Sequence, residues 1–299
     1  MSKFDHVTII SDLQEYIERH IEEDITLHSL AQQVGYSPWH VAKMFKEFTE
    51  KSPFEYIRML RLSKAALTLR DSNKKVIDVA LDFVFDSHEG FTRAFKRQFG
   101  ISPKGYQKNS PPIQLFNPYP VRDYFTYENR SIEDSSYIAD TFSTEILSFP
   151  PRKMILKRGK KAKDYFEYAN EIDCDVWGIL ISIKEALYEP VGVWLPENLR
   201  PEGTSFYAQG VEVPAEYSGV IPDGFEVIDL PAGQMLMFQG EPFEDTEFDK
   251  AIVALVNAIE SYDPALSDCR WAYELAPRIQ LEPQGYRGYI EARPVIQIS

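Results

Sequence analysis

Two groups of side chains have types and spacings suited to ligand contact, and the first of them is basic. Residues 38–110 hold 14 basic and eight acidic residues. The outer positions of their helical pattern that could touch a base or a phosphate are Trp39, His40, Lys43, Lys46, His88, Glu89, Thr92, Arg93, Lys96 and Arg97. Arg93 can bond both acceptors of a guanine edge, Thr92 can meet a thymine methyl, and lysines suit phosphates. This group predicts contact with double-stranded DNA.

The second group combines one acid with aromatic rings near the end of the sequence. Period-two alternation puts Trp271 with Tyr273 on one strand face, and Tyr289 with Glu291 on another. A carboxylate beside aromatic rings can hold a planar or cationic guest through ring contact and charge. The further aromatic side chains expected around such a guest are Trp194, Tyr207 and Phe238.

Other interpretations of both groups stay open. Basic residues on a helix face are most often only solvated, and aromatic alternation in strands is more often core. Glu291 could simply pair with Arg287 or Arg293. A hydrolase would use Glu291 with Tyr289 or Tyr273 as base and orienting group. The sequence has no nucleophile elbow, phosphate loop or metal-ligand histidine spacing, so we expect no enzyme, no metal and no cofactor.

Helical periodicity positions the basic group. Residues 26–48 contain two short amphipathic patterns joined by the turn Gly35-Tyr36-Ser37. The arrangement recurs about 50 residues later, with Phe85-Asp86-Ser87 as the turn. Residues 53–72 between the two units have the pattern of one helix, and about 18 helical residues span roughly 27 Å. Two helix-turn-helix units on this strut could place their second helices roughly 34 Å apart, one DNA turn, on one face of the duplex.

Strands and helices alternate from about residue 141, and they position the second group. We expect strands around 146–149, 154–156, 191–195, 205–213, 226–230, 234–238, 270–275 and 288–296, and helices over 165–187 and 245–262. Each half follows the order strand, helix, strand, strand, which indicates an α+β fold with a duplicated β-α-β-β unit.

Composition separates the two parts further. The chain has 299 residues and a net charge of −14, but residues 1–110 carry +1 and residues 111–299 carry −15. Dense prolines after residue 108 indicate a connector. The sequence therefore predicts a multidomain protein: an all-α tandem helix-turn-helix domain at 1–108, a connector at 109–140 and an α+β domain at 141–299. No signal core or membrane span is apparent, and Cys174 and Cys269 suit free thiols, so we expect a cytoplasmic protein.

Residues 8–108 resemble the AraC/XylS DNA-binding domain. The matching residues are Leu30-Ala31, Gly35-Tyr36-Ser37, Phe45-Lys46, Tyr56-Ile57-Arg58, Arg61-Leu62, Ala65, Ile77, Ala80, Phe85-Asp86-Ser87, the run from Phe91 to Gly100, Ser102-Pro103 and Tyr106. The resemblance implies that the major grooves are faced by Trp39, His40, Lys43, His88, Glu89, Thr92 and Arg93. Val84 and Glu50 stand where the family usually has glycine, which puts the geometry of two turns in question.

Residues 145–299 are similar to the GyrI-like effector-binding domain. The matching segments are Gly210-Val211-Glu212-Val213, Leu230-Pro231-Ala232-Gly233 and the run from Gly288 to Val295. The resemblance implies two β-α-β-β units around a cleft for lipophilic, often cationic molecules, with a glutamate in the position of Glu291. Together the two resemblances imply a ligand-responsive, sequence-specific transcription regulator with DNA, a small-molecule effector and RNA polymerase as partners, and no membrane. The alternatives are a hydrolase or a sequestering binder of a small toxic compound.

Overall fold

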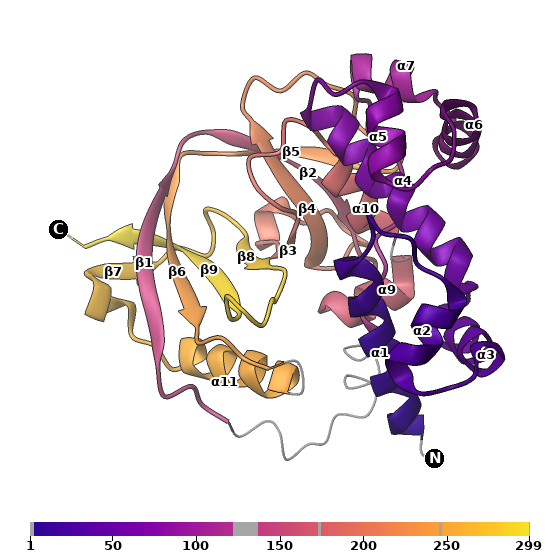
Figure 1. The fold of residues 1–299 in the computed structure, drawn as a ribbon. Coiled ribbons are helices and arrows are strands. Elements are labelled where there is room, and N and C mark those ends of the chain that lie inside the picture. Colours follow the sequence, from indigo (N-terminus) through magenta and orange to yellow (C-terminus); the bar gives the residue numbers. More distant parts are fainter. Residues whose placement is uncertain (1–2, 122–136, 173–174, 245–246, 299) are drawn as a thin grey trace. The chain divides into compact units, whose positions relative to one another are not determined.

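The computed structural model describes residues 3–121, 137–172, 175–244 and 247–298. The chain divides into two compact units, residues 1–128 and residues 129–299, which we call the helical unit and the sheet unit (Figure 1). Of the two predicted free thiols, Cys269 is free and buried, whereas Cys174 lies outside the described residues.

Seven helices build the described part of the helical unit. They are α1 Lys3–Arg19, α2 Leu27–Val34, α3 Pro38–Thr49, α4 Pro53–Asp71, α5 Val76–Asp82, α6 His88–Phe99 and α7 Pro103–Asn109. Ser37 and Ser87 cap α3 and α6, because each hydroxyl accepts a backbone N–H from three residues further on. The apolar stripes meet in a core in which Phe45, Phe91 and Phe95 are fully buried. The predicted helices and their caps are confirmed here.

The two turns that lack the family's glycine keep a glycine-like backbone. Val84 has φ 60° and Glu50 has φ 59°, in the left-handed region that Gly35 and Gly100 occupy. The hydrogen bonds also match, because Tyr36 N–H bonds the carbonyl of Ala31 and Phe85 N–H bonds that of Ala80. The turn geometry is therefore retained, with strain at the β-branched Val84.

The first residues of the predicted connector pack on the helical unit. Ile113, Leu115 and Val121 are buried. Phe116 N–H donates to the Ser63 hydroxyl at 2.7 Å, and Val121 N–H donates to the Gln14 side chain at 3.1 Å. Residues 110–121, which we call the strap, thus belong to the core of this unit.

One antiparallel sheet of nine strands forms the centre of the sheet unit, in the order β1-β6-β9-β8-β3-β4-β2-β5, with β7 paired to β9. The strands are β1 Phe142–Phe149, β2 Arg152–Arg158, β3 Val191–Trp194, β4 Tyr207–Pro214, β5 Glu226–Leu230, β6 Gly233–Gly240, β7 Cys269–Trp271, β8 Arg278–Leu281 and β9 Ile290–Gln297. The helices are α9 Tyr165–Ile172, α10 Asp175–Ser182 and α11 Phe248–Glu260, with short 3-10 helices at Glu197–Leu199 and Pro264–Ser267.

Three details of this unit differ from the sequence prediction. The helix predicted over 165–187 ends too late, since its described parts are α9 and α10 and α10 ends at Ser182. The strand predicted over 270–275 ends at Trp271, so Tyr273 lies beyond it. Strand β8 was not predicted, because its four residues, enclosed by prolines at 277 and 283, are too few for a clear alternation.

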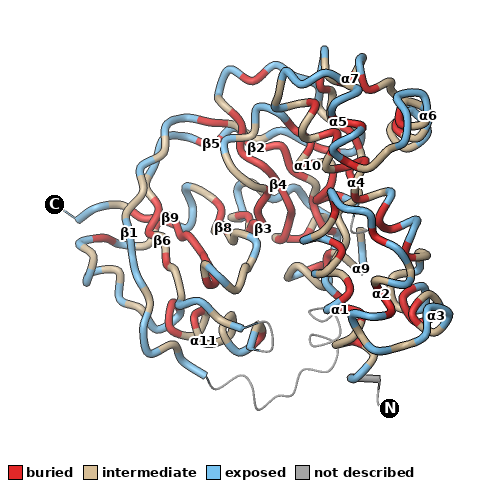
Figure 2. Tube along the Cα trace, viewed as in Figure 1, coloured by how far each residue is buried: buried red, intermediate tan, exposed pale blue. Residues whose placement is uncertain are grey.

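Burial concentrates on the inner strands, as Figure 2 shows by colour. Nearly every residue of β4 and β9 is buried, whereas β1 is largely exposed at the sheet edge. Helix α10 packs Leu180 into one core with Val211, and α11 packs Leu255 and Ile259 into another. Any acid on β4 or β9 therefore lies in the protein interior.

Candidate functional site

Helix α3 presents the first part of the predicted DNA-contacting group. Its buried stripe turns Val41 and Phe45 inward, and the opposite side exposes Trp39, Lys43 and Lys46. Trp39 is 72% exposed, and the Lys43 ammonium lies 5.6 Å from the centre of its ring. An exposed indole with a cation beside it is available to a partner from solution.

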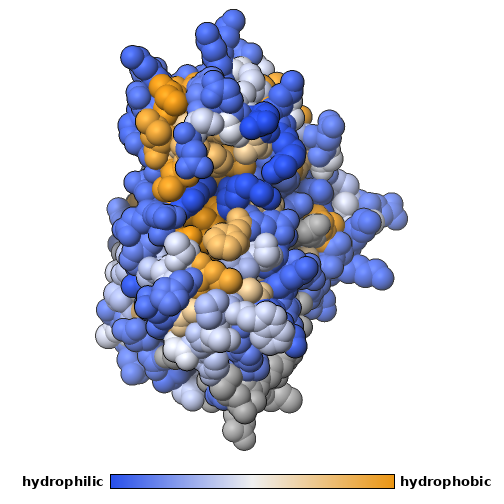
Figure 3. Space-filling model, turned by 45° about the vertical axis from the view of Figure 1, so that its right-hand side comes forward, coloured by the Kyte–Doolittle hydropathy of each residue, from blue (hydrophilic) through white to orange (hydrophobic). Residues whose placement is uncertain are grey.

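Helix α6 presents the second part. His88, Glu89, Arg93, Lys96 and Arg97 are all exposed. Across the described ranges, none of the predicted contact cations on α3 and α6 has an ion-pair partner. Hydrophilic side chains cover most of the face drawn in Figure 3. These cations are therefore free to meet phosphates or base edges.

Two of the predicted contact residues have buried polar atoms. The His40 ring stacks on Tyr36 at 5.2 Å between centroids, and its buried Nε2 atom has no hydrogen-bond partner among the described residues. The same holds for the buried hydroxyl oxygen of Thr92. Either side chain must rotate before that polar atom can bond a base, although the threonine methyl needs no such bond.

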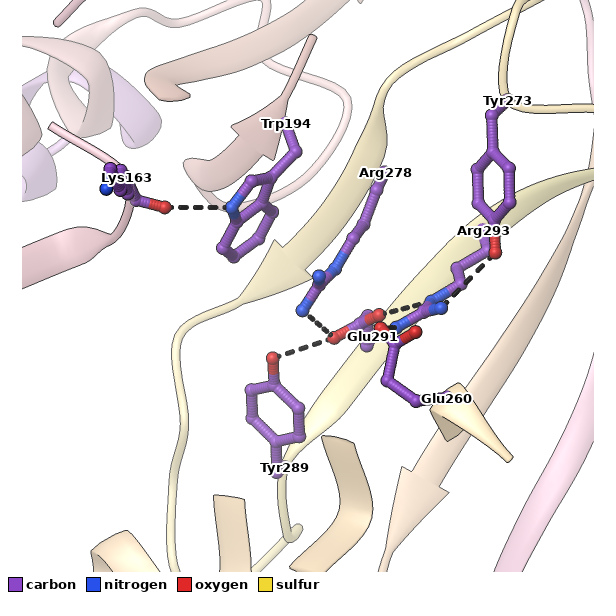
Figure 4. Close-up of polar contacts among 8 residues, drawn as sticks. All are labelled: Lys163, Trp194, Glu260, Tyr273, Arg278, Tyr289, Glu291 and Arg293. Carbon is purple, nitrogen blue, oxygen red and sulfur yellow. Dashed lines mark hydrogen bonds and ion pairs between the residues drawn. The ribbon is translucent and has the colours of Figure 1, made fainter. Parts of the chain in front are cut away.

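The acid of the second group sits at the centre of a charged network on β9 (Figure 4). Glu291 is fully buried. Its Oε2 atom accepts hydrogen bonds from Arg278 at 2.6 Å and from the Tyr289 hydroxyl at 3.0 Å. Its Oε1 atom accepts from Arg293 Nε at 2.6 Å, and Arg293 also pairs with Glu260 at 2.7 Å. Two arginines and two glutamates thus balance in charge.

Aromatic rings line this network on two sides. The Arg278 guanidinium carbon lies 4.1 Å from the Trp194 ring centre, and Trp194 Nε1 donates to the Lys163 carbonyl at 3.0 Å. On the other side, Trp271 stacks on Tyr273 at 5.5 Å between centroids, and Arg293 donates to the Tyr273 hydroxyl at 3.2 Å. The predicted pairs Trp271 with Tyr273 and Tyr289 with Glu291 do come together.

The remaining two predicted aromatics lie deeper. Tyr207 is buried and contacts the Trp194 ring edge-on at 5.0 Å. Phe238 is fully buried, directly across the β6–β9 pairing from Glu291. Its ring packs against Tyr262 at 5.1 Å, within the core under α11. Tyr207 therefore packs against Trp194, which in turn contacts the network, whereas Phe238 lies opposite Glu291 on the neighbouring strand.

Burial and charge shift the titration of this network. Burial, reinforced by the nearby Glu291 carboxylate, raises the pKa of the Tyr289 hydroxyl well above its ordinary value, so it stays a hydrogen-bond donor. The hydrogen bond from Arg293 lowers the pKa of Glu260. Burial alone would lower the pKa of Arg293, but Glu291 and Glu260 outweigh burial and raise it. Glu260 and Arg293 are thus both ionised at neutral pH.

Sequence reasoning missed part of this network and misplaced one partner. The pairing of Glu291 with Arg293 is confirmed, but pairing with Arg287 is wrong, since that guanidinium bonds Glu189. Arg278 and Glu260 were not predicted. The only signal for Arg278 is its position at the start of the short alternation in β8, and nothing local to it indicates Glu291 as its partner.

Sheet strand β4 carries a second buried acid outside this network. Glu212 is fully buried and pairs with Arg152. Burial raises the pKa of Glu212, although Arg152 acts in the opposite direction. The Arg152 guanidinium carbon lies 4.6 Å from the Phe149 ring centre and its Nη1 donates to the Pro231 carbonyl at 3.2 Å. This pair ties three strands together.

Comparisons with known proteins bear on the helical unit. A family model described as a helix-turn-helix domain matches residues 30–109. The regulatory protein SoxS of Escherichia coli is 36% identical over 102 residues, which cover 34% of this chain and 95% of SoxS. The chain belongs to the AraC family of helix-turn-helix regulators.

Two further similarities are to a regulator and to a solved structure. The transcriptional regulator Rob of Salmonella typhimurium is 40% identical over 119 residues, covering 37% of this chain and 41% of Rob. The chain thus matches about two fifths of the length of Rob. A crystal structure of a transcriptional regulator from Chromobacterium violaceum aligns with 34% of this chain and 90% of that one, at 25% identity and a TM-score of 0.33.

The described residues of the chain include neither a membrane-spanning helix nor a side-chain cluster suited to a metal ion. None of its described helices combines the length and apolar character that a membrane span needs. Within the same ranges, no group of three or more His, Cys, Asp or Glu side chains is placed to hold a metal ion.

Proposed function

We propose that this AraC-family chain is a ligand-responsive, sequence-specific DNA-binding transcription regulator of the cytoplasm. Above all, the proposal rests on the similarity to nearly the whole of SoxS, a regulatory protein. The exposed cations on α3 and α6, which have no ion-pair partner within the described ranges, agree with it. RNA polymerase is the partner expected of a transcription regulator. Rob and SoxS are regulators rather than enzymes, so the hydrolase and the sequestering binder are not favoured.

We infer that α2–α3 and α5–α6 are two helix-turn-helix units. Helix α4 lies between them and has 19 residues, which span about 28 Å. That length suits two recognition helices, α3 and α6, about one DNA turn apart. Arg93 would bond a guanine edge, and Lys43, Lys46, Lys96 and Arg97 would bond phosphates.

The sheet unit is proposed to be a duplicated β-α-β-β fold of the GyrI-like type. The segments β2-α9-α10-β3-β4 and β6-α11-β7-β8-β9 have equivalent hydrogen bonds: Gly159 N–H bonds the Tyr207 carbonyl at 3.0 Å, and Gly240 N–H bonds that of Tyr289 at 2.9 Å. Strand β3 of the first repeat corresponds to β8 of the second, and these two strands pair with each other antiparallel. Val191 lies opposite Leu281 and Val193 lies opposite Ile279, so the pairing is consistent with a two-fold relation between the repeats.

This duplication would put Gln209 in the place that Glu291 has in the second repeat. Both are buried, two residues after the equivalent tyrosines at 207 and 289. A two-fold related pair of inner positions, one neutral and one acidic, makes the centre of the sheet asymmetric in charge. We propose that the effector, a lipophilic molecule that can carry a positive charge, binds at the acidic side, around Glu291, Trp194 and Trp271.

DNA binding of the full chain at several salt concentrations tests the regulator. Arg93→Ala should weaken binding by about 1–3 kcal/mol and relax base preference at one position. Lys96→Ala should weaken all sequences alike and reduce the salt slope by about one. Absence of specific binding to any promoter fragment of its own genome would contradict the proposal.

An effector must also change that binding. It can do so only if it binds two conformations of the chain with different affinity. DNA affinity is therefore measured with and without each candidate compound, and the mass of the compound is checked after incubation. An altered mass would favour the hydrolase instead.

A further inference from the structure

We infer that Arg278 occupies the place of a cationic guest in the sheet unit and competes with such a guest for Glu291. This inference rests on the proposed effector site and names what selects its ligand. The Arg278 guanidinium is a flat cation that lies 4.1 Å from the Trp194 ring centre and donates to Glu291 Oε2 at 2.6 Å. Ring contact plus a carboxylate is the chemistry that holds planar organic cations.

The two arginines that neutralise Glu291 are held differently. Arg293 is 4% exposed, and its three nitrogens bond Glu291, Tyr273 and Glu260. The Arg278 side chain is 20% exposed, and its buried Nε atom has no hydrogen-bond partner in the described part of the chain. Arg293 is therefore part of the framework, whereas Arg278 is the replaceable cation.

The surroundings of Arg278 would remain if its side chain left. Trp194 is held by its own hydrogen bond to the Lys163 carbonyl at 3.0 Å, and Tyr207 packs behind it. Glu291 would keep its bonds to Arg293 and Tyr289. The vacated space would have an aromatic wall and a carboxylate oxygen with one bond fewer.

The charge of the network would then favour a cation. Glu291 and Glu260 balance Arg278 and Arg293 in the intact chain, so an entering cation must displace Arg278 at the cost of an ion pair. Without Arg278 the network carries one negative charge in excess. The intact site therefore disfavours simple cations, and a cation that binds beside Glu291 must displace Arg278.

Calorimetry on the full chain tests this with benzamidinium, a flat aromatic cation, and benzamide, its neutral counterpart. Arg278→Ala should bind benzamidinium at least about tenfold more tightly than the unchanged chain, with no comparable gain for benzamide. Glu291→Gln added to Arg278→Ala should remove the gain. Arg270→Ala, an exposed arginine on β7, should leave the affinity unchanged.

Three outcomes would overturn the inference: no gain in Arg278→Ala, an equal gain for benzamide, or a gain that survives Glu291→Gln. Circular dichroism verifies folding, and Arg278→Ser, which also vacates the space beside Trp194, replaces the alanine variant if that one unfolds. DNA binding of the same preparations is measured in parallel. If the unchanged chain does not bind DNA, the proposed function as a regulator is contradicted. If DNA binding is normal but Arg278→Ala does not gain affinity for benzamidinium, only the inference about Arg278 is contradicted.

Discussion

The two units place their charged site residues in opposite settings. In the helical unit, Lys43, Arg93 and Lys96 are exposed, and within the described residues they have no ion-pair partner. In the sheet unit, Glu291 is fully buried between Arg278 and Arg293. An exposed cation keeps its hydration until a partner arrives, whereas a buried carboxylate needs its counter-charge within the fold. One surface is ready for a polyanion, and the other site is already occupied by the chain itself.

The largest effect on stability is expected when a buried charge of the sheet unit is removed. Arg293→Met leaves Glu291 and Glu260 without their shared partner and should lower the free energy of unfolding by about 3–5 kcal/mol. Urea unfolding measures this loss. The matched change Arg270→Met, on an exposed arginine, should stay within about 0.5 kcal/mol. Equal midpoints for the two variants would show that the buried network does not stabilise the sheet unit.

The strap tests whether the helical unit depends on residues beyond its helices. Leu115 is 3% exposed, so Leu115→Ala should destabilise this unit by about 2–5 kcal/mol. Hydrogen exchange should show faster opening of helical-unit peptides and unchanged sheet-unit peptides. Lys108→Ala, at an exposed position, is the control. Unchanged exchange in both variants would place the strap outside the cooperative core.

A smaller effect of opposite sign is expected at the strained turn. Val84 has φ 60°, so Val84→Gly should stabilise the helical unit by about 0.5–1 kcal/mol, since the relief of strain exceeds glycine's entropy cost. Gly35→Ala, at φ 70° in the corresponding turn, should destabilise it by about 1 kcal/mol. Thermal unfolding compares the two, and a stabilising alanine at 35 would contradict the assigned backbone.

The smallest effect is a dependence of stability on acid. The hydrogen bond from Arg293 lowers the pKa of Glu260 in the folded chain, so the unfolded chain binds the proton more tightly. The contribution is complete above the unfolded pKa, about 4.3, and is lost as the pH falls through the folded value. Glu260→Gln should flatten this part of the stability curve. If Glu260→Gln leaves the low-pH part of the stability curve unchanged, Glu260 does not contribute to the pH dependence of stability.

Local patterns predicted most of the helical unit and its contact surface. Serine caps, helical stripes and outer cations all depend on residues a few positions apart, so the exposed cations on α3 and α6 could be named in advance. Local patterns could not predict the backbone conformation of the two turns that lack glycine. Val84 and Glu50 adopt the left-handed backbone because the surrounding core and hydrogen bonds impose it.

The sheet-unit site was predicted only in part. Alternation brought Tyr289 beside Glu291, and the ring pair Trp271 and Tyr273 does form. Arg278 was not foreseen, because its bond to Glu291 joins strands 13 residues apart in sequence, and β8 has too few residues to be recognised. Ion pairs across a sheet depend on strand order and register, which alternation does not specify.

The sequence by itself determined two unlike parts: helices with outer cations, and strands that carry acids among aromatic rings. Those features follow from periodicities of a few residues and from the side-chain types themselves. Only the tertiary structure decided which charges stay free and which are neutralised. Burial makes an unpaired charge costly, so the chain's own arginines pair with Glu291 wherever the fold brings them within reach.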